Sequence, residues 1–143
     1  MSTPNLGVLL RDCFRELTEH IHARLAEQGH PHVRIAHGNV FQFLDDEGTR
    51  VSVLAERAQM TKQSMGELVV HLEAHGYVER VPDPGDRRAK LVRATASGKA
   101  TYPLARAAIA EVEARWAERV GEARLRLLRE LLEELSGRGA AAR

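Results

Sequence analysis

The chain contains a single cysteine, Cys13, so no disulfide can form within it. That composition is typical of proteins from a reducing cytoplasm. Long apolar stretches are also missing, since no run approaches the roughly 20 residues that a membrane-spanning helix needs. The N-terminus lacks the basic start and the unbroken apolar segment of a signal peptide. We therefore expect a soluble, cytoplasmic protein.

An excess of charge of one sign is absent too, because 21 Lys and Arg residues face 20 Asp and Glu residues, for a formal net charge of +1. The chain as a whole therefore has little attraction for nucleic acid. Basic residues gather locally instead, between positions 80 and 93. They are Arg80, Arg87, Arg88, Lys90 and Arg93. Such a segment can bind phosphate groups even on a nearly neutral protein.

The motifs of the common enzyme classes are missing as well. The sequence has no glycine-rich phosphate loop, no cluster of metal ligands and no evident Ser/His/Asp or Cys/His site. We therefore expect no catalytic residue, no cofactor and no metal site. His71 and His75 have the i, i+4 spacing of a metal-binding pair. They come late in a predicted helix, however, and we interpret them as surface or phosphate-facing histidines.

What the chain does have is apolar residues at three- and four-residue spacing, which predicts a mainly α-helical protein. The expected helices are residues 6–29, 33–44, 52–58, 62–75, 96–120 and 122–135. Ser52, Thr61 and Thr95 are the predicted N-caps, because a small polar side chain can accept from the free N–H groups of the first turn. Gly76 is the predicted stop of the fourth helix.

Two extended runs, 77–81 and 90–94, flank the turn-forming segment PDPGDRR, which predicts a β-hairpin. A further short strand is expected at 48–50. The basic residues lie on and beside this hairpin, directly after the helix at 62–75. A helix followed by a basic hairpin suits a protein that reads one groove of DNA and probes the next.

The first helix and the last two lie far apart in the sequence, and each carries an apolar stripe. Two copies of the chain could interlock these helices into one bundle. Alternatively, the helices close the core of a single chain. Both arrangements satisfy the leucine spacing.

Two short helices, a tight turn and a hairpin describe a winged helix-turn-helix, and the residues resemble those of the MarR family of bacterial transcription regulators. Most of the likeness lies in Leu-Glu-x-x-Gly-Tyr-Val-x-Arg at 72–80, followed by Asp-Pro-x-Asp-Arg-Arg at 83–88. Thr95-x-x-Gly98 adds to it. The likeness is strongest from about 51 to 98.

The resemblance implies a mainly α fold with a small β-hairpin, in which a winged helix-turn-helix is flanked by a helical dimerisation region. Residues 1–143 would form one domain, with the DNA-binding module at about 33–98 and the dimerisation region at 1–30 and 99–143. It also implies a homodimeric repressor, a palindromic DNA operator and release by a small aromatic or lipophilic effector.

In this arrangement the helix at 62–75 would lie in the major groove, with its first turn nearest the base edges. The candidate contact residues are Thr61, Lys62, Gln63, Ser64 and Glu67. Gln63 can pair with adenine, and Ser64 can use donor or acceptor edges. In the alternative interpretation Thr61 and Ser64 only cap the helix, and Glu67 is solvated.

The wing at 82–90 would reach the minor groove. Arg88 is the expected groove residue, because a narrow A·T-rich minor groove has an enhanced negative potential. Asp86 is expected to brace the Arg88 guanidinium through a charge-assisted hydrogen bond. Arg87 and Lys90 are expected to meet phosphates. The alternative is a charged hairpin tip that is merely solvated.

Candidate effector-binding residues are Arg11, Arg15, His37 and Phe41. A cation beside apolar walls suits an aromatic carboxylate or phenolate. Each of these residues also has a plain role in packing or solvation.

Two further functions compete with a ligand-responsive repressor. One is a redox-responsive regulator that uses Cys13. The family's hydroperoxide sensors carry their cysteine where this chain has Gly7, however, and Cys13 falls on or near the apolar stripe of the first helix, where it is expected to behave as a small hydrophobe. The other is a winged-helix interaction module without DNA binding, against which Lys62 and Arg88 argue.

Overall fold

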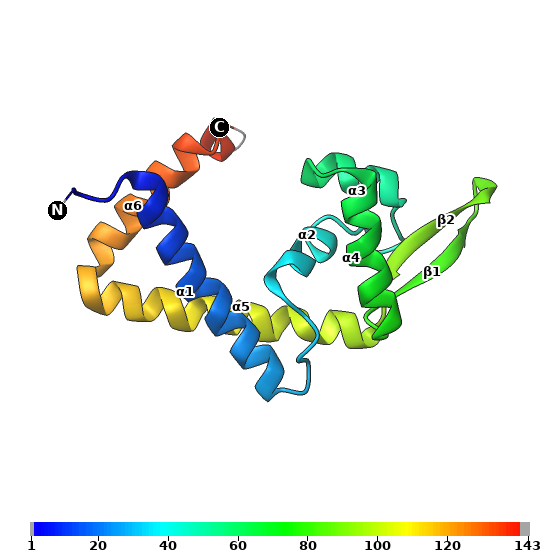
Figure 1. Ribbon diagram of the computed structural model, residues 1–143, viewed down its shortest axis with the longest axis horizontal. Coiled ribbons are helices and arrows are strands. Elements are labelled where there is room, and N and C mark those ends of the chain that lie inside the picture. The colour runs from blue at the N-terminus through cyan, green and yellow to red at the C-terminus, as the bar shows by residue number, and fades with distance from the viewer. Residues whose placement is uncertain (1, 141–143) are drawn as a thin grey trace.

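A computed structural model describes residues 2–140 and places a helical end and a winged end at opposite ends of one long helix (Figure 1). The elements are α1 (Leu6–Glu27), the 3-10 helix η1 (Ile35–His37), α2 (Gly38–Phe41), α3 (Val51–Ala58), α4 (Lys62–Ala74), β1 (Val78–Asp83), β2 (Asp86–Ala94), α5 (Ala96–Val120), α6 (Glu122–Leu135) and the 3-10 helix η2 (Arg138–Ala140). The expected fold class, mainly α with a β-hairpin, is confirmed. Each helix in the described range is too short or too polar to cross a lipid bilayer.

Two of the three predicted N-caps are confirmed. The Thr61 hydroxyl accepts a hydrogen bond from the Ser64 N–H at 3.1 Å, and the Thr95 hydroxyl accepts from the Gly98 N–H at the same distance. Helix α4 ends where predicted, because Gly76 adopts a left-handed φ of 77° that a residue with a Cβ rarely tolerates. Local hydrogen bonding therefore sets both ends of α4 and the start of α5.

The third predicted N-cap, Ser52, is wrong, because Ser52 lies within helix α3 rather than before it. Helix α3 begins at Val51, and its N-cap is Arg50, two residues before the predicted one; the Arg50 side chain makes no capping hydrogen bond. The strand expected at 48–50 is reduced to one bridge, in which Thr49 and Val92 exchange N–H···O=C bonds of 2.8 and 2.9 Å. Arg50 therefore stands at the junction between the hairpin and α3.

The helix expected at 33–44 is also wrong in its extent, since only η1 and α2 are helical there. Val33 is buried, and its carbonyl oxygen lies 3.2 Å from Nδ1 of His22. Arg34 is extended, with φ −112° and ψ 168°. These tertiary contacts hold the chain out of the helical region where periodicity alone favoured a longer helix.

The hairpin is longer than predicted. Strands β1 and β2 pair antiparallel as far as Asp83 and Asp86, with an irregularity in register after Pro82. Only Pro84 and Gly85 remain as the turn. Residues 86–88, which were expected on the loop, therefore belong to strand β2.

The core of the winged end lies among α3, α4 and the hairpin. Leu54, Met65, Leu72 and Val92 are all fully buried there. Gly98, in the first turn of α5, closes the adjacent junction, because a Cβ at this position would lie 2.1 Å from the carbonyl oxygen of Tyr77. The Thr-x-x-Gly motif thus combines a helix cap with a close backbone approach.

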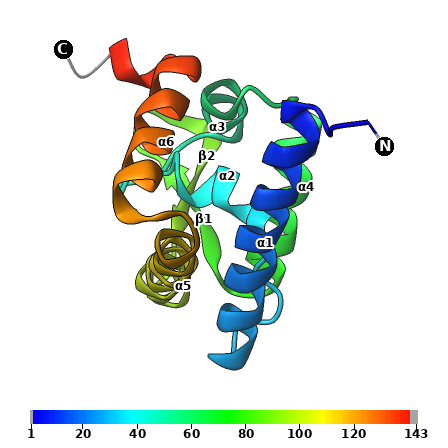
Figure 2. The same ribbon diagram turned by 90° about the vertical axis from the view of Figure 1, so that its left-hand side faces the viewer.

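The helical end is built on α5, which runs from that end to the winged end (Figure 1). Helix α1 packs across α5. Arg24 donates to both carboxylate oxygens of Glu111 at 2.9 Å, and Nε2 of His20 lies 2.6 Å from the same group. Helix α6 follows the turn at the end of α5 and rises away from it (Figure 1), and the view from this end shows α1 and α6 standing apart from each other (Figure 2).

Candidate nucleic-acid interface

Helix α4 has one face in the core and one in solvent. Met65, Val69 and Leu72 are fully buried. Because these residues anchor the inner face, the helix must turn its first polar turn outward. The predicted contact residues are all exposed: Thr61, Lys62, Gln63, Ser64 and Glu67. The structure therefore presents this set together at the start of a rigid helix, and contact with bases stays a prediction.

Val70 lies on the same outer face, and sequence reasoning missed it. Its side chain is 56% exposed although it is a large aliphatic residue. It follows Gln63 and Glu67 at helical spacing, so a helical projection anchored on Met65 could have found it. An open hollow beside it is lined by Val51, Lys62, Gln63, Gly66, Glu67, Val70, His71 and Arg80. An apolar surface among polar groups is suited to contact with a thymine methyl group.

The wing exposes its cations. Arg87, Arg88 and Lys90 are exposed on β2, and within residues 2–140 none of them takes part in an ion pair. Arg80 and Arg93, by contrast, pair with Glu73 and Glu79. The unpaired cations thus lie toward the hairpin tip, where phosphate contact is geometrically open.

The expected bracing of Arg88 by Asp86 takes a different form. Oδ1 of Asp86 accepts from the main-chain N–H of Arg88 at 3.0 Å, and no bond joins this carboxylate to the Arg88 guanidinium. Its other oxygen lies 3.7 Å from Nη2 of Arg50. Asp86 therefore shapes the backbone at the tip and leaves the Arg88 side chain free.

A second carboxylate, Asp83, ties the tip to helix α3. Nε and Nη2 of Arg50 donate to Oδ2 of Asp83 at 2.9 and 2.6 Å. The N–H of Gly85 donates to Oδ1 at 2.9 Å. The Gly85 hydrogen bond, and then the Arg50 hydrogen bond, lower the pKa of the Asp83 carboxyl. No sequence signal identified Arg50, because its partner lies 33 residues away.

Four histidines form a stack of rings, two from the C-terminal end of α4 and two from the chain before α2. Ring centroids are 4.0 Å apart for His32 and His75, 4.5 Å for His71 and His75, and 4.7 Å for His37 and His71. His71 and His75 are therefore joined to the chain before α2 as well as facing solvent. Among residues 2–140 no group of three or more potential ligands is arranged for a metal ion.

His37 is the buried member of the stack, with 4% of its surface exposed. Its Nδ1 accepts from the main-chain N–H of Arg34 at 2.8 Å. Burial, and then the positive charges that His71 and Arg34 can carry, lower the pKa of His37 to about 4. The neutral imidazole is therefore the form that the fold accommodates.

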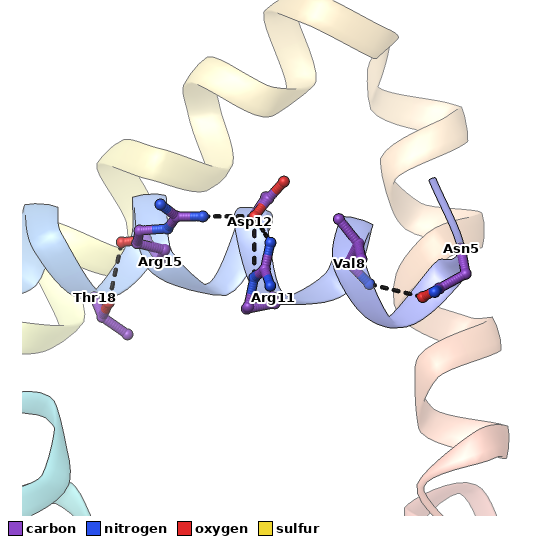
Figure 3. Close-up of polar contacts among 6 residues, drawn as sticks. All are labelled: Asn5, Val8, Arg11, Asp12, Arg15 and Thr18. Atoms are coloured by element: carbon purple, nitrogen blue, oxygen red, sulfur yellow. Dashed lines mark hydrogen bonds and ion pairs between the residues drawn. The ribbon is translucent and has the colours of Figure 1, made fainter. Parts of the chain in front are cut away.

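The four candidate effector-binding residues fall in different surroundings. Arg11 and Arg15 both donate to Oδ1 of Asp12, at 3.0 and 2.6 Å, on an exposed part of α1 (Figure 3). His37 lies in the histidine stack, whereas Phe41 packs edge-on against Tyr102 with ring centroids 5.4 Å apart. Effector binding by these residues stays a prediction.

A second surface is apolar rather than basic. Helix α6 has no buried residue, and the first half of α1 is exposed although its second half buries Ile21 and Leu25. The large exposed side chains on these two helices are Leu6, Leu9, Leu10, Phe14, Leu127, Leu128, Leu131, Leu132 and Leu135. Cys13, expected to be a small buried hydrophobe, is exposed among them. Exposed apolar side chains gathered on two helices are typical of an interaction surface.

The sequence model described as MarR family matches residues 34–89. CouR from Rhodococcus jostii, solved with p-coumaroyl-CoA bound, is 25% identical, with a TM-score of 0.67 over 92% of this chain and 91% of its own. A Mycobacterium tuberculosis MarR family protein in complex with salicylic acid is 26% identical, with a TM-score of 0.66 over 94% and 98%. The reduced form of MarR from E. coli is 18% identical, with a TM-score of 0.77 over 94% and 98%. A search of the curated proteins found no match.

Proposed function

We propose that this chain, a winged-helix regulator of the MarR family, binds double-stranded DNA as a homodimer and represses transcription until a small effector releases it. The observation that carries the proposal is the pairing of an exposed polar first turn on α4 with unpaired cations on the adjoining wing. We place this activity in the cytoplasm, where a regulator meets DNA.

Helix α4 would enter the major groove. Its buried face fixes its orientation, so Gln63 and Ser64 approach base edges as a rigid unit. Gln63 is suited to adenine, whereas Lys62 is suited to a phosphate or to guanine. Glu67, one turn later, is suited to cytosine. Together these groups support sequence-specific rather than merely electrostatic binding.

The wing would take the minor groove. The main-chain bond to Asp86 leaves the Arg88 guanidinium free, which is what insertion into a narrow groove requires. Arg87 and Lys90 would meet the phosphates on either side. Such contacts contribute affinity that falls as salt rises.

Dimerisation would cover the apolar surface of α1 and α6. In one domain of residues 1–143, segments 1–30 and 99–143 would form the shared helical region, and 33–98 the DNA-binding module. Two modules related by a two-fold axis would then favour a palindromic operator. The exposed leucines of α6 support this arrangement, since the apolar stripe of this helix is left uncovered within residues 2–140.

The effector would be a small aromatic acid. Relatives of similar fold are solved with p-coumaroyl-CoA and with salicylic acid, both of which carry an aromatic ring and a carboxyl-derived group. Arg11 and Arg15 could supply a cation, and His37 and Phe41 apolar walls, once a second copy completes the region. A redox response through Cys13 is the alternative, and loss of DNA binding on peroxide treatment that Cys13→Ser abolishes would establish it.

The test begins with selection of an operator from randomised duplex DNA by the purified protein. Anisotropy titrations at fixed salt then compare Arg88→Ala with wild type. We expect a loss of about 1–3 kcal/mol in binding free energy, because the minor-groove contact disappears while the fold remains. Arg106→Ala is the matched control, since Arg106 is exposed on α5, outside α4 and the wing. Equal affinities for wild type and Arg88→Ala would refute the wing's role, and failure of wild type to enrich any sequence would refute the function.

A further inference from the structure

Arg50 occupies the point where the wing meets the helix-turn-helix. It is the N-cap of α3, and the preceding residue, Thr49, exchanges two main-chain hydrogen bonds with Val92 of β2. The base of the hairpin is therefore fixed to α3 by the backbone. The tip, by contrast, is part of a two-stranded ribbon, which on its own is only marginally stable. What holds the tip in place must come from side chains.

The Arg50 side chain reaches that tip. Both Nε and Nη2 lie within 2.9 Å of one oxygen of Asp83, and Nη2 lies 3.7 Å from Asp86. The remaining oxygens of the two carboxylates accept the main-chain N–H groups of Gly85 and Arg88. One guanidinium thus touches both acids that define the turn.

The charges favour this contact. Asp83 and Asp86 are register partners across the turn, so their two negative charges face each other. Without a cation between them they repel one another, and they also repel the phosphates that the wing must approach. The guanidinium offsets both effects. By holding Asp83, the guanidinium also keeps a carboxylate near the start of α3. A negative charge there is favourable, and the N-cap of this helix makes no side-chain hydrogen bond.

We propose that Arg50 is a positioning residue that holds the wing tip against α3, so that Arg88 is presented to the minor groove in one fixed orientation. The inference rests on the proposed function of DNA binding. The ion pair is partly exposed, with 42% and 14% of the Arg50 and Asp83 side chains accessible. Exposed pairs contribute little to global stability. The effect of Arg50 is therefore confined to the order of the tip.

The first experiment needs no DNA. Amide hydrogen exchange of the free protein reports the Gly85 and Arg88 N–H groups directly. Both should exchange faster in Arg50→Ala than in wild type, with the melting temperature close to that of wild type. Arg57→Ala is the matched control, because Arg57 lies on the same helix and pairs with Asp45 at 3.2 Å, away from the wing. Unchanged exchange at both amides in Arg50→Ala would overturn the proposal.

The second experiment couples the anchor to binding. On the selected operator, Arg50→Ala should weaken affinity by about 3- to 10-fold, whereas Arg50→Lys, which keeps the charge but not the fork, should weaken it less. In an Arg88→Ala background the cost of Arg50→Ala should be smaller, because the groove residue is gone and only the phosphate contacts of Arg87 and Lys90 remain to be positioned. A full cost there would mean that Arg50 binds DNA independently, and it would overturn the positioning role.

A further variant keeps the test decisive if Arg50→Ala does not fold. Asp83→Asn retains the acceptor for the Gly85 N–H but loses the charge that holds Arg50. It should speed exchange at Arg88 and weaken operator binding in the same direction. Wild-type tip order and affinity in Asp83→Asn would count against the anchor. Absence of any wild-type operator would instead refute DNA binding, while the exchange result would still decide the anchor.

Discussion

Acidification should destabilise this protein through His37, and the size of the effect follows from its surroundings. The imidazole is buried, stacks on His71 and accepts the Arg34 N–H at Nδ1, so only the neutral form fits. The pKa of His37 falls from 6.5 to about 4 in the folded protein. The unfolded chain therefore takes up a proton below pH 6.5 that the folded chain refuses until about pH 4.

The difference between the two pKa values of His37 sets the sign of the pH effect and the pH range over which it acts. His37 contributes its full stability above pH 6.5, and the contribution is lost as the pH falls toward 4. Each pKa unit corresponds to about 1.4 kcal/mol, so the whole shift amounts to about 3 kcal/mol and the part between pH 6.5 and 5 to about 2 kcal/mol. Between pH 6.5 and 5 the loss of stability comes from His37 rather than from the carboxyl groups with shifted pKa values. Those carboxyls titrate at lower pH, because their pKa values are lowered from 3.8 or 4.5; they are Asp12, Asp83 and Glu111.

Urea unfolding followed by circular dichroism at pH 8, 7, 6 and 5 measures the effect. The comparison is His37→Asn, in which the amide oxygen replaces Nδ1 as acceptor for Arg34 and the titrating group is gone. Its stability at pH 8 gives the loss from packing alone. From pH 7 to pH 5 the free energy of unfolding should fall by about 2 kcal/mol more in wild type than in the variant. Parallel pH profiles for the two proteins would refute the reasoning.

Two other outcomes follow from the close approach at α5 and from the apolar surface of α6. Gly98→Ala should lower the free energy of unfolding by about 1–3 kcal/mol in urea titrations, because its Cβ would meet the Tyr77 carbonyl oxygen at 2.1 Å; wild-type stability would show that the junction can open at no cost. Leu131→Glu should yield a folded monomer in sedimentation, because a charge would enter the proposed dimer interface; a dimer that persists would place the interface elsewhere.

Local signals in the sequence predicted the elements whose ends depend on neighbouring residues. Thr61 and Thr95 cap helices as expected, and Gly76 ends α4 as expected. These outcomes follow from hydrogen bonds that span three or four residues, and from the freedom of glycine at positive φ. The three- and four-residue spacing of apolar residues predicted the helix at 62–75, whose first turn is exposed.

Contacts between distant residues produced the differences. The helix expected at 33–44 is shortened where the Val33 carbonyl is held by His22 of α1. Ser52 does not cap α3, because the bridge between Thr49 and Val92 sets the start of that helix. Neither contact leaves a mark in a local pattern, since each joins residues from separate elements.

The sequence by itself determined that this chain is a winged helix-turn-helix with an outward polar turn on α4 and cations on the wing. Periodicity, caps and the Asp-Pro-x-Asp-Arg-Arg motif suffice for that, because they act within one or two turns of chain. Only the tertiary structure decided that Asp86 shapes the backbone rather than the Arg88 side chain, that Arg50 reaches the wing tip, and that His37 is buried in a histidine stack. Charge and burial at these sites depend on which distant side chains fill the space, and that is a property of packing.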